Sequence, residues 1–499
     1  MRKSFIAGVY AIAVLLAIVS CRGAEQPKDR AAAVAGTFYP ADPTQLAAFV
    51  DGELAKAGVL QVGGTLIGLV VPHAGYPYSG PVAAYSYAQL KGKKFKRVVL
   101  IGPSHFEEIG FSSVYNGDAY TTPLGKVLVD REFAKKLASQ GRSIRLSGAG
   151  HAVGQQSEHS LEVQLPFLQR TLGDFKIVPI VMGDQSYGAM RELGMGLAKL
   201  LKDDPDTLMV ASSDLSHYHP YEDAARRDHN FLDAVTHNDF LSMSHNLESG
   251  IWEACGGGPI VTVMIAAQHL GASSPRVLKY ANSGDVTGDK GRVVGYSAMA
   301  LVKGADEAVE TKAAIADEGR AELLKIARLS VETAVREHKM YEPPPPKLTE
   351  LQLERGAFVT LTRKGELRGC VGYPSAVMPL YMVVRDVAAL AAVRDTRFSP
   401  VKPEELKDLE YEISVLSPFV HVLDVKNIQV GRDGLIARKG SLEGYLLPQV
   451  PVEEHWNRDT FLEEIGIKAG LEKDAWRDAD TDLFTFSAVV FSDHEKLKN

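Results

Sequence analysis

Short apolar runs rich in β-branched residues alternate with longer amphipathic segments between residues 34 and 303. The apolar runs are bounded by Gly, Pro or Asp and predict buried strands at 65–71, 96–102, 175–183 and 207–214. Apolar residues at helical spacing predict helices at 130–140, 188–203 and 221–237. This alternation predicts an α/β domain, with helices on both faces of a largely parallel sheet.

The pattern changes at 304–317, where the sequence GADEAVETKAAIAD has few large apolar residues and predicts a linker. A helix is expected at 318–337. The segment YEPPPPK at 341–347 then forces extended backbone, because successive prolines exclude a helix. A hairpin is expected at 357–374, so the second domain, 318–496, is predicted to be a smaller α+β unit.

The amino terminus has the pattern of an export signal. Residues 1–20 join a short basic start to an apolar stretch that ends in small residues. They run into IVSC, which resembles the lipobox of bacterial lipoproteins and implies acylation of Cys21. The expectation is an extracytoplasmic lipoprotein, anchored to the membrane at Cys21, with a polar tether over 21–33. The alternatives are an uncleaved membrane anchor and a cytoplasmic protein whose start is misassigned.

Composition changes this picture little. The chain has 499 residues, 45% hydrophobic and 23% charged, which is enough for two or three globular cores. Its net charge of -7, without a cluster of Lys and Arg, argues against a nucleic-acid partner. Besides Cys21, the cysteines are Cys255 and Cys370, too far apart in sequence to suggest a disulfide scaffold.

Histidine and acidic residues follow three of the predicted strands. His73 follows the first strand, His105 the second, and Asp214 and His217 lie at the end of the run that begins at 207. Ligands of open α/β sheets bind beyond the carboxyl ends of the strands. A lone histidine at a strand end is most often a turn or surface residue, so it is the convergence that favours a shared site.

Two further strings add candidates to this crevice. Cys255 lies in EACGGGPI, where glycines allow close approach of the backbone and a thiolate can bind Zn, Cu or Fe. His159 lies in GQQSEHSLEVQLPFLQR near a predicted helix start, where it either faces the site or caps the helix.

Six strings occur in the order PHAGYPYSG, GPSH, EHSLEVQLPFLQ, SSDLSHY, CGGGPI and VVGYSAMA. Together they resemble the Memo family over 34–303. That family is similar to the class III extradiol dioxygenases of the LigB type, which carry a non-haem iron in an α/β fold. The resemblance implies His73, His105 and Cys255 as metal ligands, with Asp214 and His217 in the same pocket.

The resemblance implies a metal cofactor, with Fe(II) first and Cu or Zn as alternatives, because a thiolate replaces the carboxylate of the LigB-type site. The expected function is redox or dioxygenase-like chemistry on a small oxygen-bearing molecule. His217 or His159 would move a proton, and Asp214 would orient His217 or bind the metal. The alternatives are a non-catalytic metal-binding lipoprotein and a peptide-binding scaffold.

The later strings ELRGCVG, DTRF, YEISVLSP and FLEEIGIKAGL resemble the AMMECR domain over 318–496, with Thr396 where that family has proline. Arg368 and Cys370 share a strand face and could form a pocket that binds an anion or offers a nucleophile. The simpler interpretation of Cys370 is a small buried strand residue. The two domains together resemble a trio completed by a radical-SAM protein, which is the expected partner.

Overall fold

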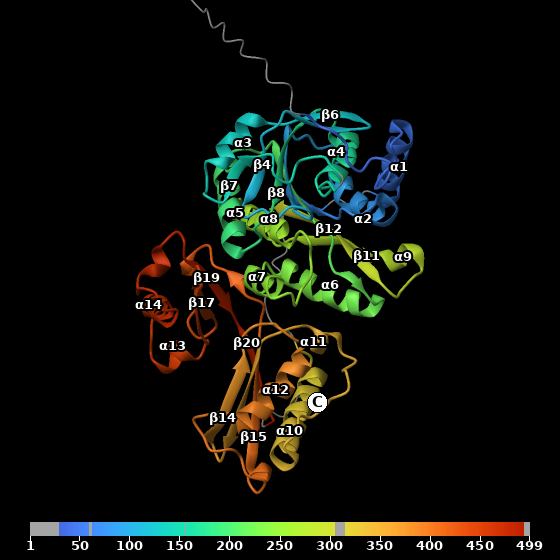
Figure 1. Ribbon diagram of the computed structural model, residues 1–499. Helices are drawn as coiled ribbons and strands as arrows, with labels where there is room; N and C mark the ends of the chain where they lie inside the picture. Colours follow the sequence, from blue (N-terminus) through green and yellow to red (C-terminus); the bar gives the residue numbers. More distant parts are fainter. Residues whose placement is uncertain (1–28, 59–61, 155, 305–314, 494–499) are drawn as a thin grey trace, which may run out of the picture.

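The computed structural model describes residues 29–58, 62–154, 156–304 and 315–493. It contains two domains, drawn from blue to yellow-green and from yellow to red in Figure 1. The predicted signal, Cys21 and most of the predicted linker lie outside the described residues. Within them, no helix has both the length and the apolar character needed to cross a membrane.

A nine-stranded mixed sheet forms the centre of the first domain. Its middle strands are parallel, in the order β2 (Thr65–Val71), β9 (Thr207–Ser212), β3 (Arg97–Pro103) and β8 (Lys176–Met182). The four predicted strands are therefore confirmed. Their near-continuous apolar sequences are typical of parallel strands buried on both faces.

The outer strands depart from the predicted parallel pattern. On one side β12 (Val293–Lys303) runs antiparallel to β2 and also pairs with β10 (His217–His219) and β11 (Arg276–Asn282). On the other side β4 (Ser112–Tyr115) runs antiparallel to β8 and parallel to β7 (Ile144–Ser147). The prediction of a parallel sheet thus holds for its centre, where helical crossovers connect the strands.

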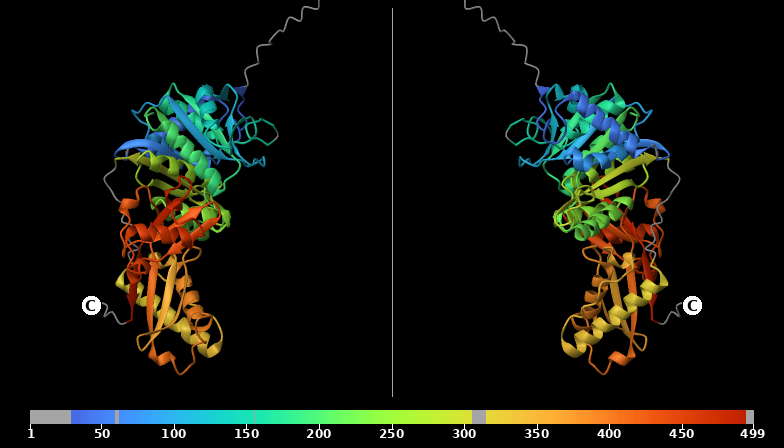
Figure 2. Two further views of the ribbon diagram at one scale, coloured as in Figure 1. Left: turned by 90° about the vertical axis from the view of Figure 1, so that its left-hand side faces the viewer. Right: turned by 90° about the vertical axis from the view of Figure 1, so that its right-hand side faces the viewer.

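Helices cover both faces of this sheet (Figures 1 and 2). One face packs against α1 (Pro43–Ala57), α2 (Tyr76–Ala88) and α4 (Leu165–Leu172). The other packs against α3 (Arg131–Ala138), α5 (Tyr187–Leu201), α6 (Tyr221–Thr236), α7 (Phe240–Glu248) and α8 (Gly257–His269). Within β3, Val98 and Leu100 join the first core while Val99 and Ile101 join the second, as the two-residue period of a strand requires.

The folded domain begins earlier than the sequence pattern indicated. Residues Asp29–Arg30 form β1, which pairs with β5 (Ala119–Thr122), and β5 pairs in turn with β6 (Gly125–Leu128). The Arg30 side chain is buried. The last residues of the predicted tether, 29–33, therefore belong to the first domain, because a long-range ion pair holds them there.

The second domain has two lobes. The first lobe contains α10 (Asp317–Glu337), α11 (Thr349–Gln352) and α12 (Leu380–Val393) against the sheet β14 (Glu366–Tyr373), β13 (Ala357–Arg363), β15 (Leu409–Leu416) and β20 (Ala488–Ser492). The second contains α13 (Val450–Glu453), α14 (Arg458–Lys468) and the sheet β16 (Val420–His421), β19 (Asp482–Phe486), β17 (Gly434–Lys439) and β18 (Leu442–Leu446). The predicted helix, hairpin and α+β class are confirmed.

The second lobe packs directly on the first domain beside α5 and α7, whereas the first lobe extends away from it (Figures 1 and 2). Phe419, Ile436 and Phe484 belong to the same hydrophobic core cluster as α5, α7 and α8. Burial of aromatic and branched side chains on both sides makes this a core-like contact between the domains.

Candidate metal centre

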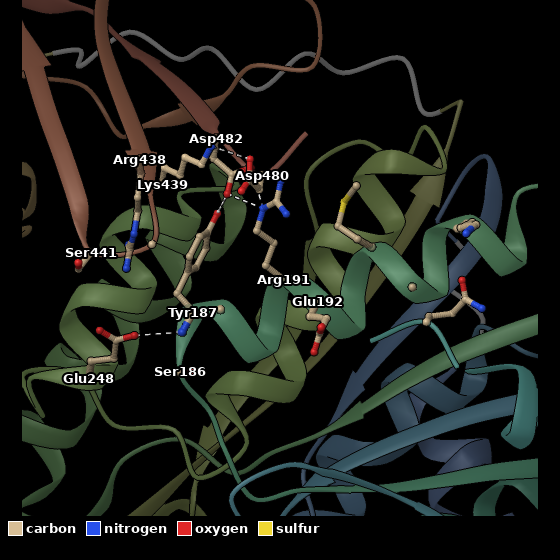
Figure 3. Close-up of a pocket in the computed structure, with 16 residues that line it drawn as sticks. Ser186, Tyr187, Arg191, Glu192, Glu248, Arg438, Lys439, Ser441, Asp480 and Asp482 are labelled. Atoms are coloured by element: carbon tan, nitrogen blue, oxygen red, sulfur yellow. Dashed lines mark hydrogen bonds and ion pairs between the residues drawn. The ribbon is translucent and has the colours of Figure 1, made fainter. Parts of the chain in front are cut away.

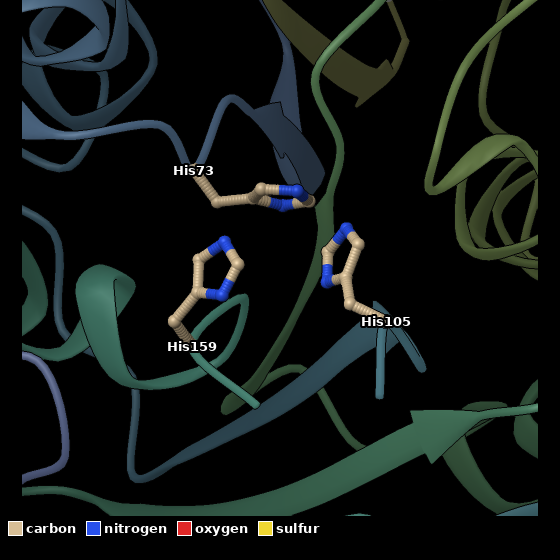
Figure 4. A group of neighbouring side chains, drawn as sticks. All are labelled: His73, His105 and His159. Atoms are coloured by element: carbon tan, nitrogen blue, oxygen red, sulfur yellow. The ribbon is translucent and has the colours of Figure 1, made fainter. Parts of the chain in front are cut away.

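Three histidines converge at the carboxyl ends of the parallel strands. His73 follows β2, His105 follows β3, and His159 precedes the short 3-10 helix η1 (Glu162–Gln164). One ring nitrogen of each lies within 4.8 Å of the others, and Figure 4 shows the rings turned toward a common space. His73 is only 1% exposed, whereas His105 is open to solvent, so the group has one accessible side.

Ser212, at the end of β9, determines which nitrogen of His73 is available. The Ser212 hydroxyl donates its one hydrogen to the Ser160 carbonyl (2.7 Å) and accepts a hydrogen bond from Gln164 Nε2 (2.8 Å). Its oxygen can therefore only accept from His73 Nδ1, at 2.9 Å. The hydrogen lies on Nδ1, and His73 Nε2 keeps the lone pair that a metal ligand needs.

Glu158 performs the same task for His105. Its carboxylate accepts hydrogen bonds from His105 Nδ1 (3.0 Å) and from the backbone amides of His105 (2.7 Å) and Ser160 (2.8 Å). Although burial opposes ionisation, the contacts with His105 hold the pKa of Glu158 well below its usual range. The pair leaves His105 Nε2 free to bind a metal, which is the usual arrangement of a carboxylate beside a metal-binding histidine.

His159 joins these two rings instead of standing apart as a helix cap. Its ring stacks on His105, with centroids 4.9 Å apart, and contacts Phe38 at 4.5 Å. Burial lowers the pKa of His159 to about 4. The imidazole is consequently neutral near pH 7 and can donate a lone pair to a metal.

Cys255 adjoins the histidines through His73. Its Sγ lies 3.1 Å from His73 Nε2 and accepts a hydrogen bond from the amide of Asp214 at 3.3 Å. Burial raises the pKa of the Cys255 thiol, so the protein alone favours the protonated form. A bound cation would favour loss of that proton, because metals bind the thiolate.

Asp214 positions the turn that carries His73. Its Oδ1 accepts hydrogen bonds from the amides of His73 (2.7 Å) and Ala74 (3.3 Å), and burial raises the pKa of the Asp214 carboxyl to about 7. The sequence predicted instead that Asp214 would orient His217 or bind the metal. His217 lines a cavity of about 560 Å³ together with Cys255. Burial lowers the pKa of His217.

A buried ion pair supports the loop that presents His159. Arg30 Nη1 lies 2.6 Å from Glu162 Oε2, and the same guanidinium donates to the carbonyl of Glu158. Glu162 also accepts hydrogen bonds from Tyr39 Oη (2.6 Å) and the amide of Val34 (2.9 Å). The N-terminal segment is thereby linked to the loop at 158–162.

Sequence reasoning missed three supporting residues: Glu158, Ser212 and Arg30. Glu158 precedes His159 directly in the string SEHS, which was a usable signal for a carboxylate beside a metal-binding histidine. Ser212 and Arg30 gave no such signal, since their partners are distant in sequence.

The candidates in the second domain have their polar groups engaged by neighbours. Arg368 forms an ion pair with Glu405 (3.0 Å) and donates to the carbonyl of Ser399 (2.8 Å). Cys370 Sγ accepts a hydrogen bond from Thr360 Oγ1 on the paired strand at 3.3 Å. The Thr360–Cys370 contact joins two paired strands, and Glu405 compensates the charge of Arg368 within the domain.

Comparison with known proteins agrees with this division of the chain. Residues 30–300 match the family model described as Memo-like protein, and residues 324–491 match the one described as AMMECR1. A MEMO1 family protein of Methanopyrus kandleri is 37% identical over 286 residues, which are 55% of this chain and 100% of that protein. One of Methanococcoides burtonii is 41% identical over 272 residues, covering 53% of this chain and 97% of that protein.

Among solved structures, an uncharacterized protein from Pyrococcus horikoshii is 42% identical. The match covers 34% of this chain and 90% of that one, with a TM-score of 0.32.

Proposed function

This chain belongs to the Memo-like protein family, and on that premise we propose that its histidine centre binds a redox-active transition metal, iron before copper. The AMMECR1 domain is fused to it at the carboxyl end. The observation that carries the proposal is the orientation of His73 and His105. Ser212 and Glu158 engage the Nδ1 atoms, so that both Nε2 atoms keep lone pairs beside His159.

The residues fit a transition metal by their chemistry. His73, His105 and His159 would hold it, with Cys255 as the adjoining sulfur ligand, and imidazole suits iron, copper and zinc alike. The thiol favours copper or zinc more than a carboxylate would. When bound, such a metal supplies Lewis acidity or electron transfer to a coordinated small molecule.

The cavity of about 560 Å³ beside Cys255 is the proposed site for that small molecule. We expect an oxygen-bearing ligand, because an iron held by three side chains keeps open positions for oxygen and substrate. His217 lines the cavity and its lowered pKa leaves the ring neutral near pH 7. The ring can therefore accept a proton from a bound hydroxyl, which is the proposed role of His217.

Metal analysis of the purified full chain tests the metal site. We expect about one equivalent of metal in the wild type after reconstitution with Fe(II), Cu(II) or Zn(II), and loss of binding in His73→Ala and His105→Ala. His229→Gln on α6 is the matched control, since His229 bonds the carbonyl of Ala225 on its own helix. Metal content that is unchanged in both alanine variants would contradict the proposal.

A non-catalytic metal-binding role is the second candidate, because three imidazoles suit zinc, which has no redox chemistry, as well as they suit iron or copper. Oxygen consumption by the iron-loaded chain with catechol-like compounds separates the two. Consumption that disappears in His105→Ala indicates an enzyme. Metal binding without consumption indicates a binding protein.

We further propose that the chain is an extracytoplasmic lipoprotein acylated at Cys21 and that a radical-SAM protein is its partner. The lipobox-like IVSC supports the first part. Incorporation of labelled fatty acid into wild type but not into Cys21→Ser tests acylation. Co-purification of the full chain with a radical-SAM protein from the same cells tests the partnership. The comparison is a chain that ends before residue 318 and so lacks the second domain.

A further inference from the structure

The proposed ligand cavity has a wall that comes from the connection between α7 and α8. Trp252, Glu253, Ala254 and Cys255 all line it, and the start of α5 forms another part through Ser186 and Met190. The three histidines of the metal centre are not among the residues that line it, although His73 contacts Cys255. The shape of the cavity beside the Cys255 thiol therefore depends on how these two segments are held.

The α7–α8 connection is fastened to the second domain. Trp252 is 4% exposed, and its indole Nε1 donates a hydrogen bond to the carboxylate of Glu354. On α7, which precedes this connection, Asn246 Nδ2 donates a hydrogen bond to the carbonyl of Ala376 at 2.6 Å. Each bond joins the segment beside Cys255 to the second domain.

The start of α5 is fastened in the same way. Tyr187 Oη donates to Asp482 Oδ2 at 2.8 Å, and Arg191 Nε lies 2.7 Å from the same oxygen. Tyr187 also donates its backbone amide to Glu248 Oε1 at 3.0 Å, which links α5 to the end of α7. Asp482 thus holds one wall while Glu354 holds the other.

A second cavity of about 810 Å³ lies between α5 and the turn joining β17 to β18. Figure 3 shows Arg438, Lys439 and Ser441 on its second-domain side and Tyr187 and Arg191 on the other. Ser186 and Glu248 line both cavities. The interdomain cavity therefore adjoins the cavity that Cys255 lines.

We propose that the second domain is part of the ligand site of the first, with Glu354 and Asp482 as positioning residues that hold its walls. The interdomain cavity is then the approach for an elongated, polar small molecule. This inference rests on the proposed function for the identity of the inner cavity as the ligand site. The fused second domain would thus fix the shape of the cavity. Loss of the Glu354 or the Asp482 contact would widen the cavity without changing the three histidines.

Alkylation of Cys255 in the metal-free full chain measures the shape of the cavity. The probes are N-ethylmaleimide and the bulkier fluorescein maleimide, with peptide mass spectrometry to follow Cys255 and Cys370 separately. In Glu354→Ala and Asp482→Ala we expect the bulky reagent to react with Cys255 about fivefold faster, since losing a hydrogen bond to a charged group eases local opening. The Cys370 rate should stay unchanged.

Three further variants separate positioning from general destabilisation. Glu354→Gln keeps an oxygen that accepts from Trp252 and should restore the wild-type rate at Cys255. Asn246→Ala removes the other hydrogen bond that joins the segment beside Cys255 to the second domain, lines neither cavity, and decides the matter where Glu354→Ala does not fold. Asp51→Ala, which breaks an ion pair with Arg170 between α1 and α4 on the other face of the sheet, is the matched control and should leave Cys255 unaffected.

Equal Cys255 rates in wild type, Glu354→Ala, Asn246→Ala and Asp482→Ala would overturn the inference. So would a parallel rise at Cys255 and Cys370, because that indicates global unfolding. The readout needs no metal, so it is independent of the metal proposal. Zn(II) affinity of the histidine centre, measured on the same variants, should remain at the wild-type value.

Discussion

The histidine centre and the β13–β14 hairpin both contain side chains with the chemistry of a functional site. They differ in which atoms of those side chains are engaged by neighbouring residues. In the hairpin, Arg368 has its charge compensated by Glu405, and Thr360 donates to Cys370. At the histidine centre, Ser212 and Glu158 engage only the Nδ1 atoms and leave Nε2 for a ligand. The difference teaches that a site is recognised by which atom of a side chain its neighbours leave available.

The largest expected effect is on metal binding. His73→Ala with His105→Ala removes two imidazole ligands and should abolish stoichiometric Zn(II) binding, as measured by equilibrium dialysis. Cys370→Ser should retain it in full. If the cysteine variant loses metal as well, the contrast between the two regions is wrong.

Removal of the Arg30 charge should have the next largest effect, on stability. Arg30→Met leaves Glu162 buried without its ion-pair partner, which costs about 3–5 kcal/mol of unfolding free energy. Denaturant unfolding measures the change. The control Lys126→Gln removes an exposed pair with Asp29 and should change stability by less than about 1 kcal/mol.

Acid should destabilise the first domain through His151, which lies outside the metal centre. His151 is 2% exposed, and burial lowers its pKa to about 4. In the unfolded state the His151 imidazole binds a proton near pH 6.5, whereas in the folded state it does so only near pH 4. The free energy of unfolding therefore decreases as the pH falls from 6.5 to 4. The shift corresponds to ~3 kcal/mol.

His151→Gln should reduce the dependence of Tm on pH between 6.5 and 4 and leave the part that His159 contributes, since burial also lowers the pKa of His159 to about 4. A pH profile identical to that of the wild type would contradict a contribution from His151. His421→Gln, at the domain interface, is the comparison variant, and its Tm is measured over the same pH range.

Glu158→Gln should weaken metal binding less than loss of a ligand does. It keeps the shape of the side chain but removes the charge that orients His105, and such changes cost about 10–100-fold in metal affinity. Titration with Zn(II) under competition with a chelator measures this. A Zn(II) affinity equal to that of the wild type would show that Glu158 does not support metal binding by His105.

The smallest effect on metal affinity is expected at Arg368. Glu405→Gln removes the charged partner of a largely buried ion pair, so it should lower stability by about 3–5 kcal/mol while leaving Zn(II) affinity unchanged. A change in metal affinity would show that the second domain contributes to the centre.

Much of this arrangement was predictable because the signals were local. Apolar runs marked β2, β3, β8 and β9, and the polar residues after them marked the crevice containing His73 and His105. The edge strands were not predictable, since their antiparallel pairing depends on partners far away in sequence. Grouping His159 with the other two histidines likewise required the loop geometry that Arg30 and Glu162 establish across the fold.

The same limit applies to the contact between domains. Trp252 and Glu354 are distant in sequence, and neither belongs to a string that indicates interaction. The change of pattern at 304–317 indicated two domains but contained no information on how their surfaces meet. Only the packed structure places the wall of the proposed ligand cavity against the second domain.

X-ray absorption spectroscopy of the Zn(II)-loaded full chain tests the central claim most directly, because it counts the ligand types around the metal. We predict an inner shell containing imidazole nitrogens, whose outer-ring scattering decreases in His159→Ala and again in His105→Ala. A shell made of oxygen alone, or an imidazole signal that none of the three histidine substitutions reduces, would contradict a metal centre built from His73, His105 and His159.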